Sequence, residues 1–195
     1  VYLINKALSA HGALVNYVAS RRSSAYLSKT DSLSSIKALS EKIKNKKIDN
    51  LFIIGGDPVY DAPVDLDFSS SIKVCENVVH LTDLFNHTSH LSTWVIPKLS
   101  TYESWMDLES KGGIVSFVQP LIQPLVQGFS ELSFILKLLQ LNMSDYAALR
   151  KYYRGMLKES FDSVWSKSLH DGVVSKLKPL FYRKSYNKKR FCFLP

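Results

Sequence analysis

Short apolar runs alternate along the first half of the chain with amphipathic stretches, and this alternation predicts an α/β fold. The runs 50-NLFIIGG-56, 74-VCENVVHL-81 and 93-TWVIP-97 are typical of buried strands, the first of them buried on both faces. Helices are expected from about residue 32 to Lys47, with Ser32 or Asp31 as N-cap, and over 65–73. Strand, helix and strand at this spacing predict right-handed parallel crossovers in a doubly wound sheet, with residues 50–56 as a central strand.

The pattern before residue 20 predicts a helix up to Ala10 and a short strand over 13–19. Farther along, Asp83 or Thr82 can cap the turn that leads into 84–91. The region 98–128 predicts an extended wrap, with a short helix near residues 102–107 and a strand near 114–118. Three helices are then expected: 130–141 with Ser130 as cap, 144–157, and 158–172 ending at Gly172.

These patterns predict three parts. They are an α/β domain over residues 1–128, a helical extension packed on it over 129–175, and a basic, poorly ordered tail over 176–195.

Composition narrows the classes of function. The chain has 195 residues, 46% apolar, and a net charge of +8 that lies largely in 42-KIKNKK-47 and 182-YRKSYNKKR-190. We interpret these runs as solvated faces and expect no nucleic-acid partner, because no recognition motif accompanies them. No apolar run reaches about 18 residues, so no membrane span is expected. No targeting leader is visible, and because the chain begins at Val1 we expect it to be a fragment of a longer protein.

The first candidate site is the loop 55-GGDP-58, which follows an apolar strand. Glycines at the carboxyl end of a parallel strand allow a backbone N–H to approach a phosphate closely. However, the chain has neither GxGxxG nor GxxxxGK[ST], and Asp57 places a negative charge where a phosphate would lie. A tight turn whose carboxylate accepts backbone N–H groups is therefore favoured over nucleotide binding.

Other polar clusters give weaker indications. His80, His87 and His90 lie within eleven residues, but no Cys or Glu completes a metal site, and capping or solvated histidines are favoured. Cys75 and Cys192 are too few for a zinc or iron–sulfur site. Glu103 and Asp107 are interpreted as acceptors of backbone N–H groups beside a packed Trp105 rather than as an acid–base pair.

An apolar stripe on the last expected helix predicts a core face, with a subunit contact as the alternative. It consists of Phe161, Trp165, Leu169 and Val173.

Five segments together carry a family resemblance. FIIGGDPVYDAP, VVHLTDLFNHTSHLSTWVIP, YESWMD, GGIVSFVQPLIQPL and WSKSLHDGVV, with the opening INKALSAHGALV, resemble the molybdopterin oxidoreductase superfamily. The branch that they resemble most is the large B subunit of bacterial alternative complex III, a quinol:electron-acceptor oxidoreductase. The similarity covers about residues 1–175.

The resemblance implies a dinucleotide-binding-like (Rossmann-like) domain in a subunit on the periplasmic face of the cytoplasmic membrane. That subunit would be held there by cytochrome and quinol-binding membrane subunits. In this branch the domain is expected to carry no molybdenum cofactor, and iron–sulfur clusters are expected in the rest of the parent subunit. The cofactor-binding positions that the family pattern implies are Gly55, Gly56, Asp57, Pro58 and Gln119, and we expect them to be vestigial.

Four positions depart from the family pattern. Asp57 replaces Asn, His87 replaces Glu, Thr101 replaces a frequent His, and Met106 replaces Gly. The sequence thus leads to a structural, cofactor-free role in an electron-transfer complex. Two alternatives stay open: a true molybdopterin-dinucleotide-binding oxidoreductase, and a stand-alone nucleotide-binding protein.

Overall fold

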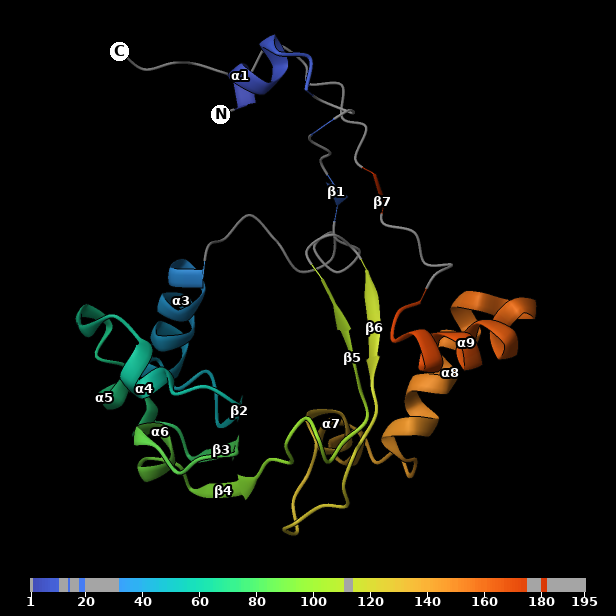
Figure 1. The fold of residues 1–195 in the computed structure, drawn as a ribbon. Coiled ribbons are helices and arrows are strands. Elements are labelled where there is room, and N and C mark those ends of the chain that lie inside the picture. The colour runs from blue at the N-terminus through green and yellow to red at the C-terminus, as the bar shows by residue number, and fades with distance from the viewer. Residues whose placement is uncertain are drawn as a thin grey trace.

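The computed structural model describes residues 2–10, 14, 18–19, 32–110, 114–174 and 180–181. Its central element is a three-stranded parallel sheet of β2 (Asn50–Ile54), β3 (Asn77–Thr82) and β4 (Trp94–Pro97), in the order β2-β3-β4. Figure 1 shows this sheet with its helices on one side of an arch. The predicted mixed α/β fold with parallel strands and flanking helices is confirmed.

Four helices flank the sheet on one side (Figure 1). They are α3 (Ser32–Lys44), α4 (Pro58–Asp61), α5 (Phe68–Ile72) and α6 (His87–His90), with a 3-10 turn at Val64–Leu66. Apolar side chains from α3, α5, β2, β3 and the turn before β3 form a buried cluster between the helices and the sheet. It consists of Ile43, Leu51, Phe68, Ile72, Cys75 and Val78. The helix predicted from residue 32 to Lys47 is α3, which ends three residues earlier than predicted, at Lys44.

The prediction that residues 50–56 form a central strand buried on both faces is wrong for the described chain. β2 lies at an edge of the sheet, and Phe52 and Ile54 are 45% and 38% exposed. Leu51, one residue along, is buried, because alternate side chains of a strand point to opposite faces. An apolar run shows that a segment is a strand but does not show how many faces are covered.

The second half of the described chain builds around an antiparallel hairpin. β5 (Met106–Glu109) pairs with β6 (Val115–Val118), followed by α7 (Glu131–Leu138), α8 (Asp145–Leu157), a 3-10 turn (Lys158–Ser160) and α9 (Phe161–Asp171). The predicted strand near 114–118 and the three helices are confirmed, with Ser130 capping α7 and Gly172 ending α9 at φ 75°. The prediction of a short helix near residues 102–107 is wrong, because a turn at these residues leads directly into β5.

A second buried cluster joins β6 to α8 and α9. Its members are Val115, Phe117, Leu149, Tyr153, Phe161, Val164, Trp165 and Val174. The predicted core face of α9 is confirmed for Phe161 and Trp165, which are 1% and 3% exposed, whereas Val173 is exposed and Val174 is buried in its place. The helices after residue 128 therefore pack on the hairpin; the domain boundary at residue 128 stays a prediction.

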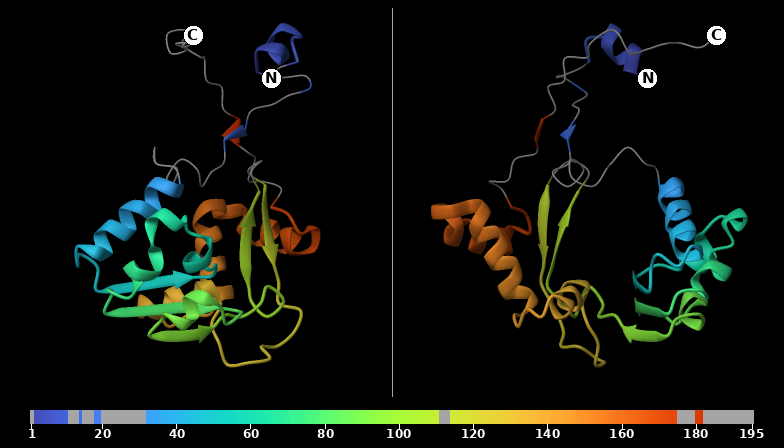
Figure 2. Two further views of the ribbon diagram at one scale, coloured as in Figure 1. Left: turned by 90° about the vertical axis from the view of Figure 1, so that its left-hand side faces the viewer. Right: turned by 180° about the vertical axis from the view of Figure 1, so that it is seen from behind.

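The described terminal segments lie apart from both clusters (Figure 2). α1 (Tyr2–Ala7) falls in the predicted opening helix, and β1 (Val18–Ala19) pairs antiparallel with β7 (Leu180–Phe181). Residues 13 and 15–17 of the predicted strand, residues 175–179, the tail after residue 181 and Cys192 lie outside the described residues, and Leu14 is in a turn rather than a strand. Within the described part of the chain, no helix has the length and apolarity needed to cross a bilayer.

Candidate functional site

The loop 55–58 leaves the carboxyl end of β2 through two left-handed glycines. Gly55 and Gly56 have φ of 67° and 70°, values that L side chains rarely adopt, so glycine is required for this turn. The N–H of Gly55 still donates to the carbonyl of Leu81 at 2.8 Å, so the strand pairing continues up to the turn. The turn carries the chain into α4, which begins at Pro58.

Both oxygens of the Asp57 carboxylate are occupied by the start of α6. Oδ1 accepts from the backbone N–H and the hydroxyl of Thr88, at 2.9 and 2.6 Å. Oδ2 accepts from the backbone N–H of His87 at 3.1 Å and contacts its Nδ1 at 3.0 Å. The predicted turn with a carboxylate that accepts backbone N–H groups is therefore confirmed.

These contacts hold Asp57 in its ionised form. Partial burial by itself raises the pKa of the Asp57 carboxyl, but the hydrogen bonds from Thr88 and His87 outweigh it and lower this pKa from 3.8 to about 2. The loop thus presents a fixed negative charge whose acceptor positions are already filled. An anionic phosphate would meet repulsion here, and no backbone N–H of His87 or Thr88 is left to receive it.

The carbonyl of Gly56 is held by one residue of β3 and by the N-cap residue of α6. It accepts from Nε2 of His80 and from the side-chain amide of Asn86, each at 3.2 Å. His80 is fully buried, and burial lowers the pKa of its imidazole, so the ring is neutral with its hydrogen on Nε2. Nδ1 of the same ring lies 3.0 Å from the hydroxyl of Ser89. The loop is therefore braced by β3 and α6 through both Gly56 and Asp57.

The first turn of α6 is capped by residues that sequence reasoning did not select. Asn86 is the N-cap, with Ser89 completing a capping box, whereas Thr82 exchanges hydrogen bonds with the backbone of Leu84 and braces the preceding turn. The pattern Asn-x-x-Ser at 86–89 is the sequence signal that marks this N-terminus.

The three histidines have separate roles. His80 is the buried tether of Gly56, His87 bonds Asp57 and stacks on Tyr60, and His90 packs edge-on against Phe85. No group of three or more His, Cys, Asp or Glu side chains in the described ranges is arranged to hold a metal ion.

Gln119 does not join the loop. Its side-chain amide donates to the carbonyl of Leu169 on α9 at 2.9 Å, so it bridges the end of β6 to the helical part of the chain. Of the five positions that the family resemblance implies for cofactor binding, only the four consecutive residues 55–58 lie together.

Glu103 also behaves as predicted, as an acceptor of backbone N–H groups. Its two carboxylate oxygens accept from Ser100 and Leu125, each at 2.8 Å, and the hydrogen bonds from Leu125 and Ser100 lower the pKa of this carboxyl. Asp107 differs, because it accepts the phenol hydrogen of Tyr153 at 2.6 Å. The two acids therefore serve different tertiary contacts and do not form an acid–base pair.

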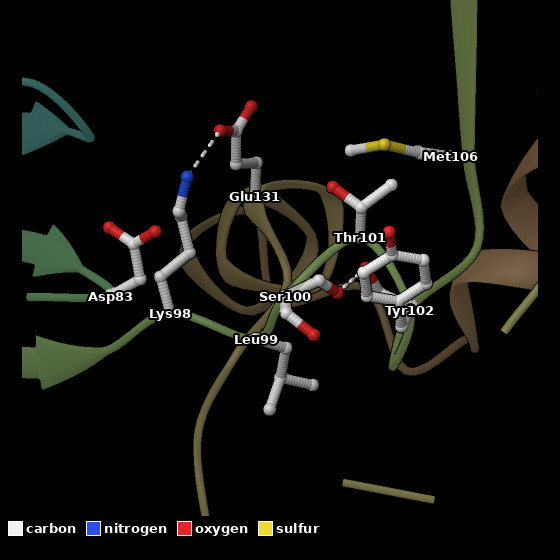
Figure 3. Close-up of a pocket in the computed structure, with 9 residues that line it drawn as sticks. Asp83, Lys98, Leu99, Ser100, Thr101, Tyr102, Met106 and Glu131 are labelled. Carbon is white, nitrogen blue, oxygen red and sulfur yellow. Dashed lines mark hydrogen bonds and ion pairs between the residues drawn. The ribbon is translucent and has the colours of Figure 1, made fainter. Parts of the chain in front are cut away.

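A small cavity of about 170 Å³ lies beyond the carboxyl ends of β3 and β4 (Figure 3). Lys98 enters it from the end of β4 and pairs with Glu131 at the start of α7, with 3.4 Å between nitrogen and oxygen. Asp83 lines the same cavity from the end of β3. One cation between two carboxylates leaves this cavity acidic, and its volume is below the roughly 300 Å³ typical of ligand sites.

A second hollow lies beside the loop itself. It is shallow and lined by apolar residues together with Asp57 and Asp61, so it is also acidic. In the first hollow one lysine faces two carboxylates, and no basic residue of the described ranges lines the second hollow, so neither has the net positive lining that favours a dinucleotide phosphate.

Comparison with known proteins adds no relative to this picture: no family model matches the chain, and no curated protein matches it significantly.

Proposed function

We propose that this chain is a non-catalytic structural portion of the molybdopterin-oxidoreductase-like subunit of a membrane-associated, quinol-oxidising respiratory complex. In this proposal the parallel sheet is part of a dinucleotide-binding-like (Rossmann-like) domain that carries no cofactor of its own. Iron–sulfur clusters belong to the rest of the parent subunit, which lies on the periplasmic face of the cytoplasmic membrane. Cytochrome and quinol-binding membrane subunits hold it there.

The observation that carries the proposal is the saturation of Asp57. The two backbone N–H groups at the start of α6 donate to this carboxylate, within hydrogen-bond distance of both oxygens. Such N–H groups are what a phosphate-binding turn offers to its ligand. Here the protein's own carboxylate takes them, which supports a turn that serves as a structural brace.

The departures from the family motif support the same proposal. Asp57 and His87 replace Asn and Glu of the family pattern, and these two side chains contact each other at 3.0 Å. In an Asn–Glu pair, residue 57 would donate the hydrogen bond and residue 87 would accept it. In the Asp–His pair, residue 87 donates and residue 57 accepts, so the contact is kept with the roles exchanged. A paired change of this kind is consistent with a shared ancestral arrangement.

The other two positions that differ from the family pattern also lie near each other in the structure. Thr101 and Met106 both line the small cavity at the end of β4 (Figure 3). A methionine side chain in place of glycine adds bulk there, which is consistent with a site that no longer has to admit a ligand.

Purification of the intact parent protein through an affinity tag tests the proposal. The expected result is co-purification from detergent-solubilised membranes with haem-containing and iron–sulfur-containing subunits. Recovery of a soluble monomer without partners would contradict the structural role. Stoichiometric molybdenum or tungsten would instead favour the alternative of a true molybdopterin-dinucleotide-binding oxidoreductase.

A further inference from the structure

The outer edge of β2 exposes three residues whose backbone groups point away from the sheet. Gly55 N–H donates to Leu81, and the N–H of Asn77 donates to Asp49, so the residues at odd positions of β2 bond to β3. By the alternation of a parallel strand, the N–H and C=O groups of Asn50, Phe52 and Ile54 then point outward. No strand pairs with that edge among the described residues.

Two of the three side chains along this edge, those of Phe52 and Ile54, are apolar and partly exposed, whereas Asn50 accepts a hydrogen bond from the side chain of Asn77. Phe52 and Ile54 lie on the sheet face opposite α3 and α5, in register with Val79 and Leu81 of β3. On this face the ring of Phe52 packs edge-on against Phe134 of α7, with 6.1 Å between centroids, and stays 45% exposed. The strand sequence contains no proline, lysine or other residue that commonly protects an edge. The opposite edge of the sheet differs, because Pro97 ends β4 and Phe129 pairs with its carbonyl.

The position of α3 restricts what can fit there. All views show the strands stacked in the order β4, β3, β2, with α3 farther along in the same direction, past β2 (Figures 1 and 2). A second copy that paired through the same edge would bring its own α3 to the same place. One added strand would instead extend the sheet beside β2, as peptides do when they add a strand to an exposed sheet edge.

Charge indicates one further property of the occupant. The last turn of α3 and the turn that leads into β2 expose four lysines against three nearby acids. The lysines are Lys42, Lys44, Lys46 and Lys47, and the acids are Glu41, Asp49 and Glu76. The amino end of the β2 edge is therefore basic, and it favours a strand with acidic residues at the end that lies there.

We propose that the β2 edge binds an extended, apolar, acid-ended strand supplied by a partner polypeptide. This inference rests on the proposed structural role, since it names the surface through which the chain would be held in its assembly. Binding would add hydrogen bonds to Asn50, Phe52 and Ile54 and would cover the exposed side chains of Phe52 and Ile54.

Hydrogen exchange of the full chain tests the edge directly. The probe is a synthetic peptide of alternating Val and Thr with an Asp-Asp pair at one end; the same peptide with Lys-Lys is the control. Without peptide, the amides of Phe52 and Ile54 should exchange much faster than those of Leu51 and Ile53. The acidic peptide should slow Phe52 and Ile54 about tenfold or more and leave Leu51 and Ile53 unchanged.

Two results overturn the inference. In the first, Phe52 and Ile54 are already protected in the free chain, which shows that the chain itself covers the edge. In the second, the acidic peptide gives no protection or acts no better than the Lys-Lys control.

A matched pair of variants separates backbone pairing from side-chain contact. Ile54→Pro removes an outward N–H, which an edge strand tolerates, and also loses the isoleucine side chain, whereas Ile54→Ala loses that side chain but keeps the N–H. Ile54→Pro should abolish peptide protection and co-purification, and Ile54→Ala should retain both. If Ile54→Pro co-purifies as well as the wild type, the edge proposal fails and the structural role stands. If the wild type co-purifies with nothing, the structural role fails, while the peptide result still reports on the edge.

Discussion

Asp57 and Thr88, thirty-one residues apart, are joined by two hydrogen bonds to a single carboxylate oxygen, of 2.9 and 2.6 Å. This contact fixes the glycine turn after β2 to the first turn of α6. It also explains why a loop with the glycines of a phosphate-binding turn has no free amide at Thr88 to offer a phosphate.

Removal of the Asp57 carboxylate should destabilise the fold. Asp57→Ala leaves the N–H groups of His87 and Thr88 without their acceptor, and we expect a loss of about 2 kcal/mol in the free energy of unfolding by urea. Asp57→Asn keeps one acceptor oxygen and should lose about half as much. Asp61→Ala, on the exposed side of α4, is the control and should change stability by less than about 0.5 kcal/mol. An Asp57→Ala variant as stable as this control would contradict the brace.

The same carboxylate predicts a pH dependence. The folded-state pKa of Asp57 is lowered to about 2, so its contribution to stability is complete above the unfolded value near 4 and is lost as the pH falls toward 2. The shift corresponds to about 2 kcal/mol. Urea midpoints measured between about pH 5 and 2 should therefore fall more steeply for the wild type than for Asp57→Asn. Parallel curves for the two proteins would show that the carboxylate is not held as described.

Two glycines should respond to alanine with opposite signs. Gly56 has φ 70° and open space where a Cβ would lie, so Gly56→Ala should cost about 1 kcal/mol through backbone strain alone. Gly155 lies in α8, also with open space, so Gly155→Ala should stabilise by about 0.5 to 1 kcal/mol. Thermal or urea unfolding measures both, and equal effects at the two sites would contradict the left-handed turn.

The second core depends on Phe161. This ring stacks on Trp165 with 5.5 Å between centroids and lies under the guanidinium groups of Arg150 and Arg154. Phe161→Ala should cost about 3 to 5 kcal/mol, the usual range for a buried aromatic. Leu139→Ala, at an exposed position after α7, should cost less than about 1 kcal/mol. Similar losses for the two variants would show that Phe161 is not in a packed core.

Much of the fold could be predicted because local signals agree with the final structure. The strands β2, β3 and β4 coincide with the apolar runs. As expected, α7 begins after its cap Ser130 and α9 ends at Gly172. The helix expected near residues 102–107 failed for a tertiary reason. Met106–Glu109 pairs with β6, and Asp107 bonds Tyr153 forty-six residues away, which overrides the local preference.

The candidate site was predictable only in part. The glycines and the charge of Asp57 indicated a turn with a bonded carboxylate, but nothing local shows that the donors are His87 and Thr88 on another helix. Gln119 was grouped with the loop through the family resemblance, and its bond to Leu169 places it elsewhere. The exposure of Phe52 and Ile54 could not be predicted from the sequence, because the same apolar pattern occurs in edge strands and in central strands.

The most direct test of the central claim is the metal and pterin content of the intact parent protein, measured by elemental mass spectrometry and by the fluorescence of oxidised extracts. If Asp57 has replaced the ligand at the glycine turn, neither molybdenum, tungsten nor pterin should reach a stoichiometric amount per polypeptide. One pterin dinucleotide per chain, with or without its metal, would contradict the account.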